Sequence, residues 1–199
     1  MISMIEKARI IENAAHALLN NDLNTGSEII KTEYPFTAPR DKVRKCKESQ
    51  KISIFFRDHF IDRYSGDKLV NPGMLKALSH YFPQEFPYHP SWKQSVSHVA
   101  YWELVPTIDH IHPIANGGDD KESNWITTNM LHNKIKSNWS LEQLGWKIVD
   151  INNPEAWDGL SSMFLQLVQN DTELSSDPYI KRWRNLTIKA LKPCYPHQN

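Results

Sequence analysis

Apolar side chains recur at intervals of three and four residues near the N-terminus, the spacing of one face of an α-helix. The stripe consists of Ile5, Ala8, Ile11, Ala15, Leu18 and Leu19. It predicts a helix over residues 4–19, ended by Asn20-Asn-Asp22, and a shorter helix through Glu28-Ile-Ile30 after it.

Helical spacing returns on both sides of the middle of the chain. Apolar positions predict helices over residues 52–61 and 72–81. Closer to the C-terminus, one more helical stripe consists of Trp157, Leu160, Phe164, Leu167 and Val168. A last helix is predicted to begin at Asp177-Pro178, because an N-cap acid followed by proline suits a first turn.

Between these helices the pattern changes to that of strands. Residues 98–111 are rich in β-branched and aromatic side chains, which predicts an extended strand. Residues 125–128 predict a second, short strand, and a helix over 129–138 would follow with Thr128 as its N-cap. Ser140-Leu-Glu-Gln143 is a capping-box pattern. Helices before and after a pair of strands predict an α+β protein.

The length of the chain fits one well-packed domain with helical additions, since it has 199 residues. We expect an N-terminal helical segment with a basic stretch over residues 1–51 and a core over residues 52–150. A C-terminal helical pair over residues 151–199 would pack on that core.

The overall charge does not indicate a polyanionic partner, because 23 basic and 23 acidic residues give a net charge of zero. A polyanionic partner would therefore have to be bound by a local basic cluster. Basic residues are dense between residues 40 and 51, Arg44 and Lys45 among them. They form either a solvated helix face or a contact with phosphate.

The two cysteines, Cys46 and Cys194, lie far apart and outside any Cys-x-x-Cys pair. A disulfide framework is not expected, and a reducing compartment fits. The N-terminus carries charges where a signal peptide would need an apolar segment, and no apolar run approaches the ~20 residues that span a bilayer. We expect a cytoplasmic protein without a membrane partner.

Candidate chemistry is concentrated between the predicted strands and on the helix that follows. Asp109, His110 and His112 precede a Pro/Gly-rich loop, and His132 adjoins Asn133 farther on. Side chains of adjacent helical residues point about 100° apart, so one metal ion cannot easily be held by both. These residues suggest a metal site with a general base, but leave open which of them take part.

The order and spacing of these residues resemble the HNH family of ββα-metal endonucleases. Asp109-His110 ends a strand, and a Gly-bearing loop leads to Asn124 before the second strand. Asn133 follows nine residues after Asn124, and Lys136 three residues after that. The resemblance covers roughly residues 52–146 and implies a ββα-metal core embedded in helical N- and C-terminal extensions.

The resemblance also implies roles for individual residues. His110 would be the general base, and Asn124 would fix the loop and orient the imidazole. Asp109 and Asn133 would hold a single Mg²⁺ or Mn²⁺ ion, which prefers such carboxylate and amide oxygens. Lys134 and Lys136, together with the basic stretch, are expected to contact nucleic acid, with solvated side chains as the alternative.

One part of the chain departs from the family pattern. Many HNH proteins carry a structural zinc knuckle, and here Asp62 and Ser65 stand where its first two cysteines would be. Asn129 and His132 complete the set. Because four such side chains make a poor tetrahedral zinc site, we expect hydrogen bonds and packing instead of structural zinc, with His132 in a structural role.

The implied activity is metal-dependent hydrolysis of phosphodiester bonds, with double-stranded DNA as the expected partner and restriction or phage defence as a role that would fit. Two alternatives stay open: a nucleic-acid-binding protein without turnover, and an RNA-directed nuclease with the same site. One site cuts one strand, so a double-strand cut would require a homodimer or two successive events.

Overall fold

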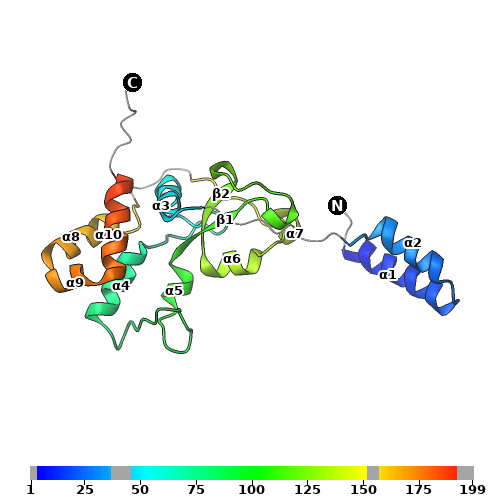
Figure 1. The fold of residues 1–199 in the computed structure, drawn as a ribbon, viewed down its shortest axis with the longest axis horizontal. Coiled ribbons are helices and arrows are strands. Elements are labelled where there is room, and N and C mark those ends of the chain that lie inside the picture. The colour runs from blue at the N-terminus through cyan, green and yellow to red at the C-terminus, as the bar shows by residue number, and fades with distance from the viewer. Residues whose placement is uncertain (1–3, 37–45, 152–156, 192–199) are drawn as a thin grey trace, which may run out of the picture. The chain divides into compact units, whose positions relative to one another are not determined.

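The computed structural model describes residues 4–36, 46–151 and 157–191 (Figure 1). The chain divides into two compact units, Met1–Pro39 and Arg40–Asn199. The segments expected to form the core and the C-terminal helical pair belong to the same unit. Arg44, Lys45 and Cys194 lie outside the described residues.

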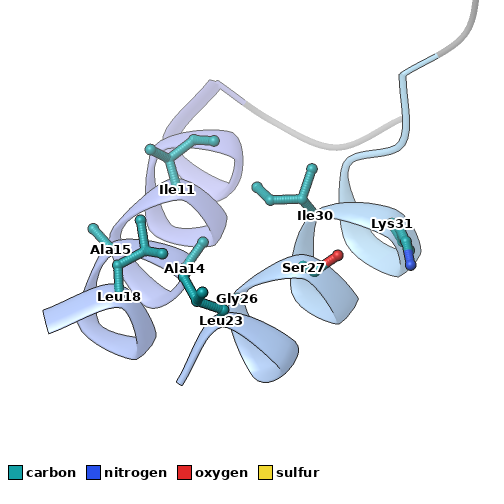
Figure 2. Close-up of a pocket in the computed structure, with 9 residues that line it drawn as sticks. All are labelled: Ile11, Ala14, Ala15, Leu18, Leu23, Gly26, Ser27, Ile30 and Lys31. Carbon is teal, nitrogen blue, oxygen red and sulfur yellow. The ribbon is translucent and has the colours of Figure 1, made fainter. Parts of the chain in front are cut away.

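The N-terminal unit is a pair of helices, α1 (Met4–Leu19) and α2 (Leu23–Glu33), packed against each other. The predicted bounds of the first helix are confirmed, and the second is longer than predicted. Asp22 ends the connection between them by accepting a hydrogen bond from the Thr25 amide as the N-cap of α2. Side chains of both helices, Ile11 and Ile30 among them, line an apolar groove between them (Figure 2).

The larger unit has a helical layer formed by α3 (Glu48–Arg57), α4 (Pro72–Tyr81), α8 (Ser161–Asn170), α9 (Thr172–Ser176) and α10 (Pro178–Leu191). Helix α10 contacts α3, α4 and α8. The main core lies among these helices and includes Met74, Leu75, Tyr101, Phe164, Leu174 and Ile180. As predicted, Asp177 caps α10, accepting hydrogen bonds from the Tyr179 and Ile180 amides.

The sheet has two antiparallel strands, β1 (Pro106–His110) and β2 (Trp125–Asn129), and α6 (Met130–Lys136) follows β2 directly. Helix α3 contacts both strands, and α6 packs against them as well. A second apolar cluster beneath the strands includes Ile52, Phe55, Phe60 and Leu69, with Ile108 packed against it. The molecule thus mixes helix and strand, and the predicted α+β class is confirmed.

Several local predictions are wrong. The helix predicted over residues 52–61 is α3, which begins four residues earlier and ends at Arg57, and Trp157 and Leu160 precede α8 instead of lying within it. Residues 98–111 do not form one strand, because α5 (Ala100–Glu103) occupies the first part and β1 begins at Pro106. Asn129, not Thr128, caps α6 by accepting a hydrogen bond from the His132 amide. The capping box of α7 (Leu141–Leu144) forms as predicted between Ser140 and Gln143.

No helix within the described ranges is both long enough and apolar enough to cross a membrane.

Candidate functional site

The site lies where β1 ends, opposite the beginning of β2. Asp109 pairs with Ile126 and His110 with Trp125 in the antiparallel register. Helix α6 brings Asn133 and Lys136 back to the same strand, because it begins immediately after β2 and packs on β1. The residues predicted from spacing are therefore gathered around one strand end.

Asp109 is buried, and its Oδ2 atom has two close partners. The Tyr64 hydroxyl donates to Oδ2 at 2.6 Å, and the Lys136 Nζ lies 2.9 Å from the same atom. Lys136 is 0% exposed and also donates to the carbonyl oxygen of His110 at 2.7 Å. The ammonium thus neutralises a carboxylate that would otherwise be costly to bury.

This placement corrects one expectation about Lys136. A fully buried ammonium bonded to Asp109 and to the His110 carbonyl cannot contact a phosphate backbone in this structure. Lys136 instead holds the end of β1 to α6. The expectation of a nucleic-acid contact stays a prediction for its neighbour Lys134, which is exposed and lies over the Trp102 ring at 4.6 Å from the centroid.

The amide of Asn133 is fixed beside Asp109. Its Nδ2 atom donates to the carbonyl oxygen of Ile108 at 3.0 Å and to the Thr107 hydroxyl at 3.2 Å. Both hydrogen atoms of the amide nitrogen are used in this way, so Oδ1 is the atom left to act as a ligand or acceptor. The backbone group that anchors this amide belongs to the residue just before Asp109.

His110 is buried, and its Nε2 atom belongs to a compact group of three polar atoms. The Asp120 Oδ1 atom lies 2.9 Å from Nε2, and the Trp125 Nε1 atom lies 3.0 Å from both. Sequence reasoning missed Asp120 and the indole nitrogen of Trp125. The one sequence signal for Asp120 is its place shortly after the glycine pair of the loop. An acid at such a position is ordinarily interpreted as a solvated turn residue.

Asn124 holds the loop together, but its side-chain hydrogen bonds go to backbone groups and not to the imidazole of His110, so the expected orienting role is wrong. Its Oδ1 accepts from the His112 amide, and its Nδ2 donates to the carbonyl oxygens of His112 and Asp119. Its expected loop-fixing role matches these contacts. The imidazole is contacted instead by Asp120, whose position in the chain follows the carbonyl that Asn124 holds.

Backbone geometry requires glycine at both loop positions, Gly117 and Gly118. Gly117 has φ 99°, a left-handed conformation that favours glycine. A Cβ atom on Gly118 would lie 2.0 Å from the carbonyl oxygen of His112, so no side chain fits there. The adjoining His112 is exposed, and its ring contacts the carbonyl oxygen of Asn116 at 3.1 Å.

The residues expected in place of a zinc knuckle form a hydrogen-bonded cluster around Asp62, which is fully buried. Its Oδ2 atom lies 2.9 Å from Nδ1 of His132 and accepts from the Asn129 amide and the Thr128 hydroxyl. Its Oδ1 atom accepts from the amides of Tyr64 and Ser65. His132 thus has a carboxylate partner remote in sequence and lies in this cluster.

Tyr64 connects this cluster to the candidate site. Its amide bonds to Asp62, its ring lies 5.2 Å from that of Trp146, and its hydroxyl bonds to Asp109. The Trp146 ring also contacts His132 edge-to-face. Burial, together with the nearby Asp109 charge, raises the pKa of Tyr64 well above its ordinary value. The hydroxyl therefore stays protonated and remains a donor to Asp109 throughout the physiological pH range.

The donor types at this strand end would suit a hard divalent cation, although Oδ2 of Asp109 already bonds to Tyr64 and Lys136. Asp109 supplies a carboxylate and Asn133 an amide oxygen, donor types that Mg²⁺ and Mn²⁺ accept while keeping several waters. The hydrogen bonds of Asn133 commit its nitrogen to β1 and leave its oxygen available. In the described part of the chain, no three or more His, Cys, Asp or Glu residues are grouped to hold a metal. A Mg²⁺ site with one carboxylate and one amide does not require such a group.

Comparisons of the chain with models of protein families, with curated proteins and with solved structures find no match.

Proposed function

We propose that the protein is a metal-dependent endonuclease that hydrolyses phosphodiester bonds, with DNA as its substrate and a ββα-metal core as its catalytic module. The observation that carries the proposal is the convergence of Asp109, His110 and Asn133 at one strand end. They are at the sequence spacing that resembles the HNH family, and hydrogen bonds fix each of their side chains.

Asp109 and Asn133 would hold the metal ion. When bound, the ion would polarise the scissile phosphate and stabilise the charge that develops on the leaving oxygen. Tyr64 and Lys136 orient the Asp109 carboxylate, and the β1 backbone orients the Asn133 amide. Such outer partners commonly fix the direction of metal ligands.

His110 would take the proton of the attacking water. The water oxygen then forms a bond to phosphorus, the bond from phosphorus to the 3′ oxygen breaks, and the electron pair stays on that oxygen. The leaving oxygen gains a proton from solvent. Resemblance to the family implies products with 5′-phosphate and 3′-hydroxyl ends.

The rival proposal is a scaffold that binds nucleic acid and does not cut it. A binding module has no need for a buried imidazole whose ring is held by a carboxylate and an indole, so the fixed His110 at the strand end that also carries Asp109 favours the enzyme. An RNA-directed nuclease with the same site is the other alternative. Specificity in either case would come from base contacts away from the phosphate-binding residues.

The test is a cleavage assay on sequence-matched duplex DNA, single-stranded DNA and RNA, each with Mg²⁺, Mn²⁺ or EDTA. We expect metal-dependent products from duplex DNA and none in EDTA. Cleavage of RNA alone would contradict the substrate assignment while keeping the chemistry. Binding to all three without products under any condition would support the non-catalytic alternative.

Tyr64→Phe is expected to weaken binding of the metal ion without unfolding the protein. The change removes the hydroxyl that donates to Asp109 but keeps the ring against Trp146. Losing such an outer partner typically costs about 10- to 100-fold in metal affinity or activity. The half-saturating Mg²⁺ concentration for cleavage, measured for the variant and the wild type, should be higher in the variant by that factor.

Tyr81→Phe removes an exposed tyrosine hydroxyl bonded to Asp171 and serves as the matched control, with no change expected. Equal half-saturating concentrations for Tyr64→Phe and the wild type would contradict this account of Tyr64.

A further inference from the structure

The three-atom group at the His110 imidazole allows two arrangements of protons. Nε2 of His110, Oδ1 of Asp120 and Nε1 of Trp125 all lie within 3.0 Å of one another. The indole Nε1 carries one hydrogen and is always a donor, whereas a carboxylate oxygen is an acceptor. The Nε2 atom of a neutral imidazole either donates to Asp120 or accepts from Trp125. In the first case Nδ1 has a lone pair, and in the second case Nδ1 carries the hydrogen.

Charge favours the first arrangement. A carboxylate oxygen is a stronger acceptor than a neutral imidazole nitrogen, and it has lone pairs for two donors at once. Asp120 can therefore accept from both Trp125 and His110, with each donor at hydrogen-bonding distance. In the second arrangement the carboxylate and the imidazole would compete for one indole hydrogen.

Neighbouring contacts hold the group in place. Trp125 is the strand partner of His110 and is itself buried, so its indole is carried to the imidazole by the sheet register. The side chains of His110 and Asp120 are only 7% and 16% exposed. Asn124 fixes the loop one residue before Asp120 through the carbonyl oxygen of Asp119. Water therefore has little access to replace Asp120 at Nε2.

We propose that Asp120 is a positioning residue that holds His110 in the tautomer with hydrogen on Nε2 and a lone pair on Nδ1, with Trp125 supporting the carboxylate. The inference rests on the proposed function, in which His110 takes the proton of the attacking water, and it assigns that step to Nδ1. During that step the Nε2 hydrogen stays bonded to Asp120. The opposite tautomer has hydrogen on Nδ1 and its only lone pair directed at the indole, and it cannot act as the base.

The first test observes the tautomer directly and needs no catalysis. Protein labelled with ¹⁵N at histidine is measured by NMR at a pH above the titration range of imidazole, and the His110 signals are assigned by their loss in His110→Ala. We expect hydrogen on Nε2 in the wild type. Asp120→Asn should weaken or reverse that preference, because its amide can donate to Nε2. Hydrogen on Nδ1 of His110 in the wild type would overturn the proposal.

Two further variants separate positioning from general damage to the loop. Asp119→Asn is the matched control, because this neighbouring acid is 49% exposed and pairs only with Lys121 through its side chain. It should leave the tautomer and cleavage unchanged. Trp125→Phe removes the indole donor but keeps an aromatic ring, and should keep hydrogen on Nε2. A tautomer that changes in Trp125→Phe and not in Asp120→Asn would assign control to the indole and overturn the role of Asp120.

The second test is kinetic. Asp120→Asn should lower kcat by about 10²- to 10⁴-fold, the range for loss of a general base, with KM changed by only a few fold. A variant with wild-type kcat would overturn the proposal. If the wild-type protein cleaves nothing, the proposed function fails, and the tautomer experiment still decides whether Asp120 positions His110.

Discussion

Replacing His110 by alanine is expected to lower the rate of DNA cleavage by about 10²- to 10⁴-fold, the usual cost of losing a general base. His110 is buried at the end of β1, with the carboxylate of Asp109 beside it in the sequence and Asp120 bonded to its ring. The rate should be measured at saturating metal, so that a change in metal affinity does not enter.

The matched control for this variant is His112→Ala. His112 lies two residues away and is exposed. Its ring bonds to the carbonyl oxygen of Asn116, whereas its bonds with Asn124 are made by the backbone, which the substitution keeps. We expect its removal to leave the rate within a few fold of the wild type. A His110→Ala protein that keeps its fold and more than a tenth of the activity would exclude His110 as the base.

The second large effect is expected on stability, from Lys136→Met. The substitution keeps an unbranched side chain in the space but leaves the Asp109 carboxylate buried without its cation. Breaking a buried ion pair from one side typically costs about 3–5 kcal/mol. The free energy of unfolding, measured by urea denaturation at neutral pH, should fall by that amount.

Lys134→Met is the control on the same helix, because Lys134 is exposed and should change the free energy of unfolding by only about 0.5 kcal/mol. Adding Asp109→Asn to Lys136→Met removes the uncompensated charge and should recover part of the lost stability. Equal stability of Lys136→Met and the wild type would mean that the pair does not hold β1 to α6.

The sequence was sufficient to predict the elements whose signals are local. The helix at Pro72–Tyr81, the cap at Asp177 and the strand at Trp125 follow from short-range spacing and capping chemistry. The strand predicted over residues 98–111 was wrong in its first half. Tyr101 and Val105 are buried four residues apart against the helical core, and this tertiary packing overrides their strand propensity.

The cap of α6 was misplaced for a similar reason. The hydroxyl of Thr128 could cap a helix, but in the structure it donates to Asp62, 66 residues earlier in the chain. Asn129 is free to take the cap instead. No local pattern contains this competition, because the partner that decides it comes from a distant loop.

In the candidate site, too, some residues can be predicted from local sequence and others depend on distant packing. Asp109, His110, Asn124 and Asn133 could be selected from their spacing, because the strands and α6 are continuous in sequence. Tyr64 and Asp120 could not, since each reaches the site through the packing of a loop. Lys136 belongs to the same spacing pattern, but its expected contact with nucleic acid is wrong, because burial cannot be read from spacing alone.

The most direct test of the central claim is a supercoiled-plasmid assay with Mg²⁺, Mn²⁺ or EDTA, using the wild type, Asn133→Ala and His132→Ala. We predict metal-dependent nicking by the wild type, its loss in Asn133→Ala, and its retention in folded His132→Ala, because His132 bonds to Asp62 in the neighbouring cluster. Loss of nicking in His132→Ala with retention in Asn133→Ala would place the metal ligand one residue earlier. Absence of nicking by the wild type with either metal ion would contradict the assignment of a phosphodiester-cleaving site.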